Sequence, residues 1–254
     1  MIYLPLPTLV SDPPPPPLAD IQLKINGNTT IHGRWCPYPE SVGAILYLHG
    51  NAGNIQVFAP EVFRIQQATK MSVLIIDYPG YGRSEGSPSE QGCYDAAYSA
   101  YRWLTETAGI PAEQLVIYGE SLGGAIAIDL ASQVPHQALV LVRTFASMSD
   151  MVRLKFPVLS SVWKVANRFD SIHKIGLCRA PILLAQATHD TLVPYAQGER
   201  LREASSQPVQ WLELRGHTHN SPLSTEFYEQ LQQFVTTTRL SRETTHIASR
   251  PYRP

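Results

Sequence analysis

Ser121 stands between two glycines, where an apolar run meets a run rich in alanine. Residues 115–118 read Leu-Val-Ile-Tyr, the motif Gly-Glu-Ser-Leu-Gly follows at 119–123, and residues 124–131 read Gly-Ala-Ile-Ala-Ile-Asp-Leu-Ala. A strand, G-x-S-x-G and a helix in this order are typical of a nucleophile elbow, a sharp turn on which glycines avoid collisions with neighbouring elements. The serine is expected to adopt an unfavourable backbone conformation. The pattern predicts that Ser121 is a nucleophile for acyl transfer.

Two backbone amides are expected to stabilise the negative charge that forms when this serine attacks a carbonyl. Leu122 would open the helix after the turn, where unpaired N–H groups and the helix dipole favour an oxyanion. A second donor should come from a loop after an earlier strand. The segment Leu-Tyr-Leu-His-Gly-Asn-Ala-Gly-Asn at 46–54 supplies such a loop. We assign the second donor to the backbone amide of Asn51.

A serine hydroxyl is a weak nucleophile at neutral pH. A histidine must therefore take its proton, and a carboxylate must hold that histidine in the right tautomer. Downstream of Ser121, one apolar run leads to Asp190, and the run 209–214 leads to His217 and His219. Serine, acid and histidine in this chain order suit a nucleophile elbow. The spacing predicts Asp190 as the acid but does not separate the two histidines.

Other residues compete for these roles. Asp77 also ends an apolar run, but it precedes the serine, so we expect it to brace its own loop. His49 is expected to pack beneath the oxyanion loop, and His189 to contact substrate or to lie in solvent. Gly80 and Gly82 follow a predicted strand, as in dinucleotide-binding loops. The next residues, Arg-Ser-Glu-Gly-Ser-Pro, delay the helix that a pyrophosphate would need.

The elements that would hold these residues alternate along the chain. Continuous apolar runs suit strands that are covered on both faces of a parallel sheet. They occur at 44–48, 73–76, 115–118, 138–142 and 182–184. Segments of helical length lie between them at 59–69, 90–107 and 122–133, and an antiparallel hairpin is predicted from residue 21. This order predicts a doubly wound α/β fold.

Five prolines at 13–17 predict a stiff N-terminal lead-in, residues 1–18, that joins no core. The α/β domain is expected at 19–238, followed by a disordered polar tail at 239–254. Residues 146–178 interrupt the alternation of strands and helices and carry scattered apolar residues. We interpret them as a small helical cap inserted above the sheet. An ordinary crossover helix with a long loop is the alternative.

The composition excludes some partners. A net charge of −1, with 44% apolar and 16% charged residues, describes a globular core without the field that recruits nucleic acid. No apolar stretch is long enough to span a bilayer, so we expect a soluble cytoplasmic protein. Between Arg143 and Arg179 seven Lys or Arg residues face two Asp residues. This excess suits peripheral contact with an anionic membrane surface and equally suits a solvated basic face. The oligomeric state is not indicated.

Five motifs together resemble the α/β-hydrolase superfamily and, within it, the small abhydrolase-domain serine hydrolases that include protein depalmitoylases. They are HGNAGN at 49–54, DYPGYGRSEG at 77–86, YGESLGG at 118–124, DTLVP at 190–194 and GHTHN at 216–220. The resemblance implies a mostly parallel eight-stranded sheet and no cofactor. It also implies that the histidine followed by asparagine is the base, which selects His219 over His217.

The resemblance is not complete. Ala187 stands where the family often has glycine, Ser221 stands where it often has an acidic residue, and Met1 to Leu18 contain no cysteine. The expected function is cleavage of carboxylic esters or thioesters through an acyl-enzyme on Ser121. A lysophospholipase or monoacylglycerol lipase and an acyl-protein thioesterase remain alternatives, ahead of a peptidase. A non-catalytic binding protein on this fold would commonly lack a triad residue, and all three are present here.

Overall fold

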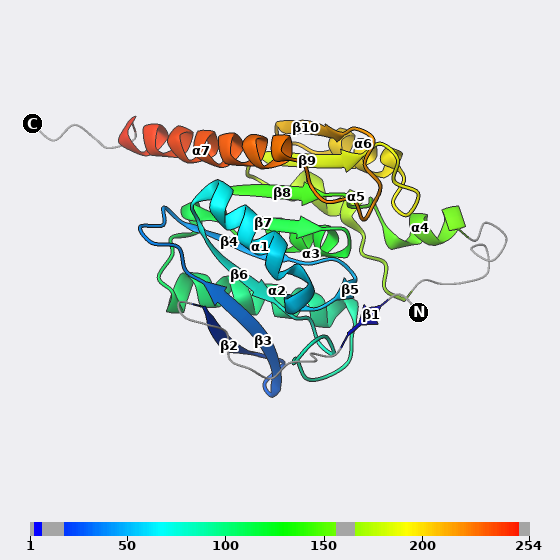
Figure 1. The fold of residues 1–254 in the computed structure, drawn as a ribbon, viewed down its shortest axis with the longest axis horizontal. Coiled ribbons are helices and arrows are strands. Elements are labelled where there is room, and N and C mark those ends of the chain that lie inside the picture. The colour runs from blue at the N-terminus through cyan, green and yellow to red at the C-terminus, as the bar shows by residue number, and fades with distance from the viewer. Residues whose placement is uncertain (1–2, 7–17, 156–165, 249–254) are drawn as a thin grey trace, which may run out of the picture.

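A mostly parallel sheet of eight strands forms the centre of the molecule (Figure 1). The computed structural model describes residues 3–6, 18–155 and 166–248. The strands are β2 (Ala19–Ile25), β3 (Thr29–Cys36), β4 (Ala44–Leu48), β6 (Ser72–Ile76), β7 (Leu115–Glu120), β8 (Ala138–Val142), β9 (Ile182–Ala187) and β10 (Val209–Leu214). Their order is β10-β9-β8-β7-β4-β6-β3-β2, and only the pairs that include β3 are antiparallel. The predicted sheet and hairpin are confirmed.

The apolar runs are continuous because both faces of the sheet are covered. In β4 every residue is buried. Ala44, Leu46 and Leu48 belong to the core on one face, whereas Ile45 and Tyr47 belong to the core on the other. Successive side chains of a strand point to opposite faces, so a strand buried on both sides needs an apolar residue at every position.

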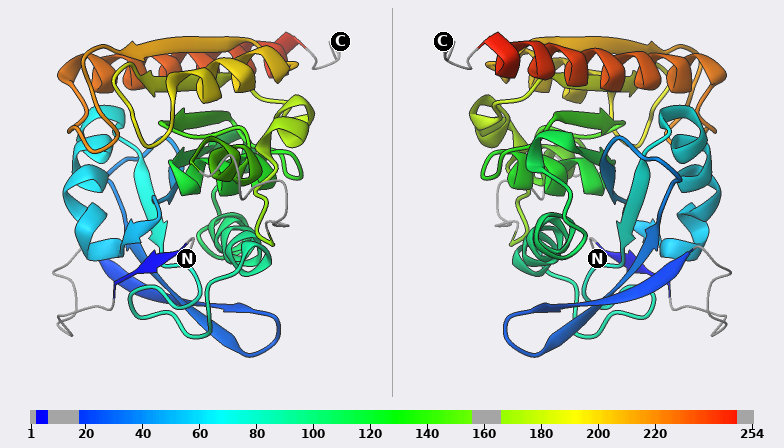
Figure 2. Two further views of the ribbon diagram at one scale, coloured as in Figure 1. Left: turned by 90° about the vertical axis from the view of Figure 1, so that its right-hand side faces the viewer. Right: turned by 90° about the vertical axis from the view of Figure 1, so that its left-hand side faces the viewer.

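Helices cover the two faces in separate groups (Figure 2). One face carries α1 (Ile55–Thr69) and α7 (Thr225–Ala248), and the other carries α2 (Glu90–Arg102), α3 (Leu122–Ala131), α5 (Ser171–Lys174) and α6 (Tyr195–Ala204). Short 3₁₀ or π turns occur at η1 (Trp103–Thr107), η2 (Ala112–Gln114) and η3 (Ile175–Leu177). Polar caps begin the first two helices: Gln56 N donates to Asn54 Oδ1 at 3.0 Å, and Gly92 N donates to Ser89 Oγ at 3.0 Å.

The N-terminal lead-in was predicted to join no core, and for residues 3–6 this prediction is wrong. Tyr3 is buried in the main core. Strand β1 (Leu4–Pro5) pairs in parallel with β5 (Ala52–Gly53) and makes a second, two-stranded sheet. Proline can occupy such an edge because its missing N–H need not enter a ladder. The five prolines at 13–17 lie outside the described residues.

The last helix is longer than the sequence predicted. Its packed part includes Phe227 and Leu231, which are fully buried. The helix continues to Ala248, so residues 239–248 are helical where a disordered tail was expected. Extending a helix costs little once packing has formed its first turns, and neither glycine nor proline interrupts this stretch. Within the described ranges, no helix combines the length and apolar character that crossing a bilayer requires.

The predicted insertion at 146–178 divides into two parts. Helix α4 (Met148–Lys155) lies beyond the carboxyl ends of the central strands, on the same side of the molecule as β1 (Figure 1). Helix α5 instead packs against α3 and α6 and returns the chain to β9 as a crossover. The cap interpretation therefore describes α4, and the crossover alternative describes α5. Residues 156–165 lie outside the described part.

Candidate active site

Ser121 lies on the sharp turn between β7 and α3. Its φ of 54° and ψ of −116° are a conformation that residues other than glycine rarely adopt. Thr144 Oγ1 donates to the Ser121 carbonyl oxygen at 2.7 Å and helps to hold the turn. A Cβ on Gly123 would lie 1.9 Å from the Leu48 carbonyl oxygen, and one on Gly119 would lie 2.3 Å from the Gly123 oxygen. The predicted strained turn and the need for both glycines are confirmed.

The loops after β9 and β10 bring an acid and a histidine to this serine. His219 Nε2 lies 3.0 Å from Ser121 Oγ, and His219 Nδ1 lies 2.7 Å from Asp190 Oδ2. The Asp190 carboxylate is buried, and its Oδ1 accepts hydrogen bonds from Leu192 N at 2.8 Å and Val193 N at 2.7 Å. These two amides orient the carboxylate. The three residues can therefore pass a proton from the serine hydroxyl to the imidazole.

Two other histidines, His217 and His189, lie in the same loops. His217 Nδ1 is 3.0 Å from the Arg215 carbonyl oxygen, within its own turn. The His217 carbonyl oxygen in turn accepts a hydrogen bond from His189 N at 2.9 Å. These contacts tie the loop after β9 to the loop after β10. Of the two histidines that spacing left open, His219 is the one placed between Ser121 and the acid.

Asp77, the rival acid, braces its loop as expected. It is fully buried, and its Oδ1 accepts a hydrogen bond from Ile55 N, at the start of α1, at 2.9 Å. Its Oδ2 lies 3.2 Å from His32 Nδ1. A Cβ on Gly82 would lie 2.0 Å from the same carboxylate oxygen. Gly82 thus makes room for Asp77, and Gly80 makes room for Pro88, whose Cδ would lie 2.7 Å from an added Cβ. These two close approaches explain a pattern that resembled a dinucleotide-binding loop.

His49 packs beneath the oxyanion loop, as predicted. Its ring is fully buried and lies 4.5 Å from the ring of Tyr78 and 5.1 Å from that of Phe58, between centroids. His49 Nδ1 lies 2.7 Å from the Gly50 carbonyl oxygen. Burial lowers the pKa of His49, so the ring is held neutral. It supports the loop as a packed side chain.

The two predicted oxyanion donors both lie beside the serine. Leu122 is the first residue of α3, so its amide is among those that have no acceptor within the helix. Asn51 lines the same cavity as Ser121 and Leu122. Its side-chain Oδ1 accepts hydrogen bonds from Leu4 N at 3.2 Å and from Tyr81 Oη at 2.8 Å. These contacts hold the loop that carries the second predicted donor.

The N-terminal segment is the part of this site that the motifs did not reveal. Besides the contact from Leu4, the Leu6 carbonyl oxygen accepts hydrogen bonds from Gly82 N at 3.1 Å and Asn54 Nδ2 at 3.2 Å. The segment thereby crosslinks the oxyanion loop and the loop after β6. Only the apolar character of the first residues hinted at burial, and the neighbouring prolines outweighed that hint.

Ser121 opens onto two cavities that share the walls Leu4, Asn51 and Leu192. The first, which we call the α4 cavity, has a volume of about 370 Å³ and is mostly apolar. Its further lining includes Leu122, Phe145, Met148, Met151, Val152 and Lys155. The second, which we call the Glu61 cavity, has a volume of about 400 Å³. Its further lining includes Phe58, Glu61, Glu120, Arg143, His219 and Leu223. Both volumes suit small ligands.

Arg143, counted in the sequence as a cation of the cap, is instead a buried wall of the Glu61 cavity. Its Nη2 lies 2.5 Å from Glu120 Oε1, and its Nη1 donates to the Ser221 carbonyl oxygen at 2.6 Å. The other oxygen of Glu120 accepts a hydrogen bond from Tyr47 Oη at 2.9 Å. Lys174 likewise pairs with an acid outside the cap, Asp129. The described part of this segment is therefore less basic than its residue count indicates.

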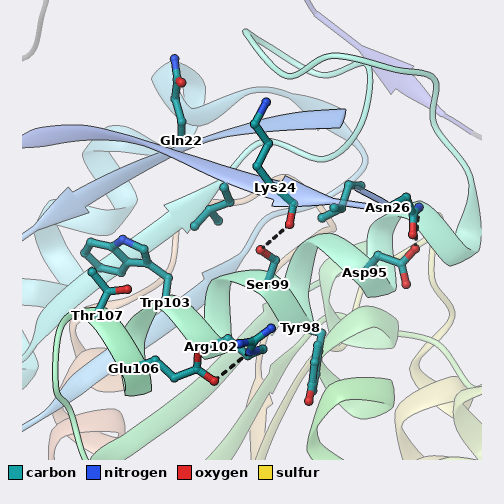
Figure 3. Close-up of a pocket in the computed structure, with 12 residues that line it drawn as sticks. Gln22, Lys24, Asn26, Asp95, Tyr98, Ser99, Arg102, Trp103, Glu106 and Thr107 are labelled. Carbon is teal, nitrogen blue, oxygen red and sulfur yellow. Dashed lines mark hydrogen bonds and ion pairs between the residues drawn. The ribbon is translucent and has the colours of Figure 1, made fainter. Parts of the chain in front are cut away.

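A third hollow, between β2 and α2, lies at the opposite edge of the sheet from β10 (Figure 3). Its polar side chains bond to one another: Arg102 Nη2 lies 2.7 Å from Glu106 Oε2, and Asn26 Nδ2 donates to Asp95 Oδ2 at 2.9 Å. None of the predicted site residues lines it. Its serine, Ser99, donates to the Lys24 carbonyl oxygen at 3.0 Å, and no histidine that could activate a hydroxyl is among the lining residues.

The cysteines offer no second nucleophile. Cys36, Cys93 and Cys178 are free and buried. Burial raises the pKa of Cys36 to about 11 and that of Cys178 to about 12, which disfavours the reactive thiolate. Among the described residues, no group of three or more His, Cys, Asp or Glu side chains is arranged to hold a metal ion.

Comparison with known proteins identifies the family of this chain. Residues 43–163 match the family model described as the alpha/beta hydrolase fold. An uncharacterized protein of Mycobacterium tuberculosis is 33% identical over 80% of this chain and 73% of its own length. Alpha/beta hydrolase domain-containing protein 17B of Xenopus tropicalis is 30% identical over 78% of this chain and 68% of its own length. The chain therefore belongs to the alpha/beta hydrolase superfamily, in its abhydrolase-domain branch.

The solved structures agree on the fold. An esterase of Pyrococcus furiosus superposes with a TM-score of 0.73, covers 93% of this chain and 98% of its own, and shares 14% identity. At that identity the similarity concerns architecture alone. Family and fold together make the protein a hydrolase.

Proposed function

We propose that the protein is a serine hydrolase that cleaves carboxylic esters or thioesters through an acyl-enzyme on Ser121. The observation that carries the proposal is the hydrogen-bonded line from Asp190 through His219 to Ser121 Oγ, with distances of 2.7 and 3.0 Å. The line ends at a serine that opens onto two cavities. A nucleophile, its base and space for a substrate therefore coincide.

In the first half of the proposed reaction, His219 Nε2 takes the proton of Ser121 Oγ as this oxygen attacks the substrate carbonyl carbon. Asp190 accepts the Nδ1–H of the imidazole and stabilises the imidazolium that forms. The backbone amides of Leu122 and Asn51 donate to the carbonyl oxygen as it becomes negatively charged. When the bond to the alcohol or thiol breaks, that leaving group receives the proton from His219.

In the second half, water takes the place of the leaving group. His219 removes a proton from the water, the resulting hydroxide attacks the acyl carbon, and the ester bond to Ser121 breaks. The carboxylic acid leaves, and the serine recovers its proton from His219. The net reaction consumes one water molecule and yields an acid with an alcohol or a thiol. Lysophospholipids, monoacylglycerols and acylated protein thiols are all esters or thioesters that fit this scheme.

The test is to replace the nucleophile. Ser121→Ala should lower kcat/KM for p-nitrophenyl butyrate by at least about 10³-fold, because the oxyanion donors and binding alone retain only residual catalysis. The same variant should lose labelling by a fluorophosphonate probe. Ser87→Ala, at an exposed serine on the loop before α2, is the matched control and should behave as wild type. Undiminished turnover in folded Ser121→Ala would reject the proposal.

A further inference from the structure

The two cavities beside Ser121 differ in which reacting groups they contain. His219 lines the Glu61 cavity, and Leu122 lines the α4 cavity. In the reaction proposed above, on which this inference rests, the imidazole must deliver its proton to the departing alcohol or thiol. The leaving group must therefore lie on the His219 side. The geometry places the leaving group in the Glu61 cavity and the acyl chain in the α4 cavity.

Two carboxylates line the Glu61 cavity, and one of them, Glu61, forms its ion pair with a residue outside the lining. Arg143 and Glu120 pair with each other, and both oxygens of Glu120 are engaged. Glu61, from α1, accepts a hydrogen bond from Tyr228 Oη at 2.9 Å. Its ion pair with Arg64 is 3.5 Å long, and the Arg64 side chain is 54% exposed, so water and salt screen this pair. Among the residues that line the cavity, two carboxylates, Glu61 and Glu120, therefore face one cation, Arg143.

The Glu61 carboxylate is also sheltered. Its side chain is only 16% exposed. Burial raises the pKa of Glu61, and the neighbouring Glu120 acts in the same direction, whereas Tyr228, Arg64 and Arg143 act against it. A cation in the cavity would favour the ionised form of Glu61. Its attraction to this carboxylate would be stronger than at the surface, because water screens a sheltered charge only weakly. A carboxylate accepts hydrogen bonds and attracts cations but offers no donor to an anionic group.

We propose that the Glu61 cavity selects esters or thioesters whose alcohol or thiol part carries a positive charge. The apolar walls Phe58 and Leu223 would enclose the carbon chain that joins the reacting oxygen or sulfur to the cation. Glu61 would attract the cation at the far end. The acyl chain, on the other side of Ser121, would not contribute to this preference.

The experiment compares three hexanoyl thioesters that differ only in the leaving thiol. Thiocholine is the cation, 3,3-dimethylbutane-1-thiol is its uncharged carbon isostere, and 2-mercaptoethanesulfonate is the anion. Released thiol is measured with a chromogenic disulfide. Each kcat/KM is divided by the rate constant for hydrolysis of the same thioester by hydroxide, because the three thiols differ in acidity and therefore as leaving groups. After this correction the wild type should prefer thiocholine over the uncharged isostere by about three- to tenfold, the size expected for a partly screened charge pair, and should use the anion least.

Glu61→Gln keeps the shape and the acceptor for Tyr228 but removes the charge. It should bring the corrected ratio of kcat/KM for the cationic and the uncharged thioester to about one. Both values come from the same enzyme sample, so any change in overall turnover cancels in the ratio. Glu203→Gln, at an exposed position on α6, is the matched control and should keep the wild-type ratio.

Three outcomes would overturn the inference. They are equal use of cationic and uncharged thioesters by the wild type, a preference that survives in Glu61→Gln, and an equal loss for all three substrates in that variant, which would mean a structural role. Absence of turnover for every thioester and ester, together with absence of fluorophosphonate labelling, would instead overturn the proposed function itself and this inference with it.

Discussion

The loops at the strand ends and the segments that lie over them are built by different means. Ser121, Asp190 and His219 each lie one to five residues beyond a strand of the parallel sheet, and short hydrogen bonds hold them. Residues 3–6 and α4 reach the same place from distant parts of the chain. The strand-end loops hold the chemistry of the site. The overlying segments add Leu4 to the walls of both cavities and one side of α4 to the wall of the α4 cavity.

The strand-end loops and the overlying segments therefore differ in how firmly they are held. A turn at a strand end is rigid because the sheet holds the preceding residues, and it can fix reacting atoms within a few tenths of an ångström. An overlying segment is held by fewer contacts and can change shape without disturbing the turn. Changes in the loops should therefore remove turnover, whereas changes in the overlying segments should alter how well particular substrates react.

The largest expected effect tests the loops with the two neighbouring histidines. His219→Ala should lower kcat/KM for p-nitrophenyl butyrate by at least about 10³-fold, because the serine loses the group that takes its proton. His217→Ala should change it by no more than about twofold, since this side chain bonds only within its own turn. Steady-state kinetics on both variants, with thermal melting as a check of folding, make the measurement. A larger loss in His217→Ala would reverse the assignment.

The same division explains what could be predicted from the sequence. The elbow, the acid and the histidine loop are local patterns, since each depends on a few adjacent residues and the strand before them. The continuous apolar runs predicted the parallel sheet for the same reason. Spacing alone left His217 and His219 equal, because a turn of a few residues can direct either side chain toward the serine. Only the family resemblance and then the geometry separated them.

The errors concern contacts between distant parts of the chain. Tyr3 lies with its ring centroid 6.3 Å from that of Phe169, and its hydroxyl donates to Asn167 Oδ1 at 3.0 Å. Nothing in the residues around Tyr3 signals a partner more than 160 positions away. Arg143 was counted as a surface cation for the same reason, because its partners Glu120, at the end of β7, and Ser221 come from other parts of the chain. Local composition does not reveal such pairings.

A smaller effect is expected where the N-terminal strand touches the oxyanion loop. Leu4 N donates to Asn51 Oδ1, so Leu4→Pro removes the donor and should loosen the loop that carries the second predicted oxyanion amide. We expect kcat to fall by about three- to tenfold, less than the roughly 10²-fold or more that follows loss of a donor itself. Kinetics with a short ester, whose acyl part barely reaches the cavity walls, measure this change.

Leu4→Ala is the matched variant, since it keeps the N–H but removes the side chain shared by both cavities. It should raise KM and leave kcat near that of wild type. If both variants lower kcat equally, the side chain rather than the hydrogen bond is what matters. If neither variant changes the kinetics, the N-terminal strand does not position the oxyanion loop. The strand-end loops would then hold the reacting groups without help from the overlying segments.

The smallest expected effect concerns α4 and depends on acyl-chain length. Met151 is buried and lines the α4 cavity, so Met151→Ala should weaken contact with a long acyl chain but not with an acetyl group. Each buried methylene is worth about 0.8 kcal/mol, so losing contact with about one methylene should lower kcat/KM for octanoyl esters by about two- to fourfold. Leu154→Ala, on an exposed position of the same helix, should leave the chain-length profile unchanged. An equal loss for acetyl and octanoyl esters in Met151→Ala would mean that α4 supports the turn itself and that chemistry and selection are not separate in this protein.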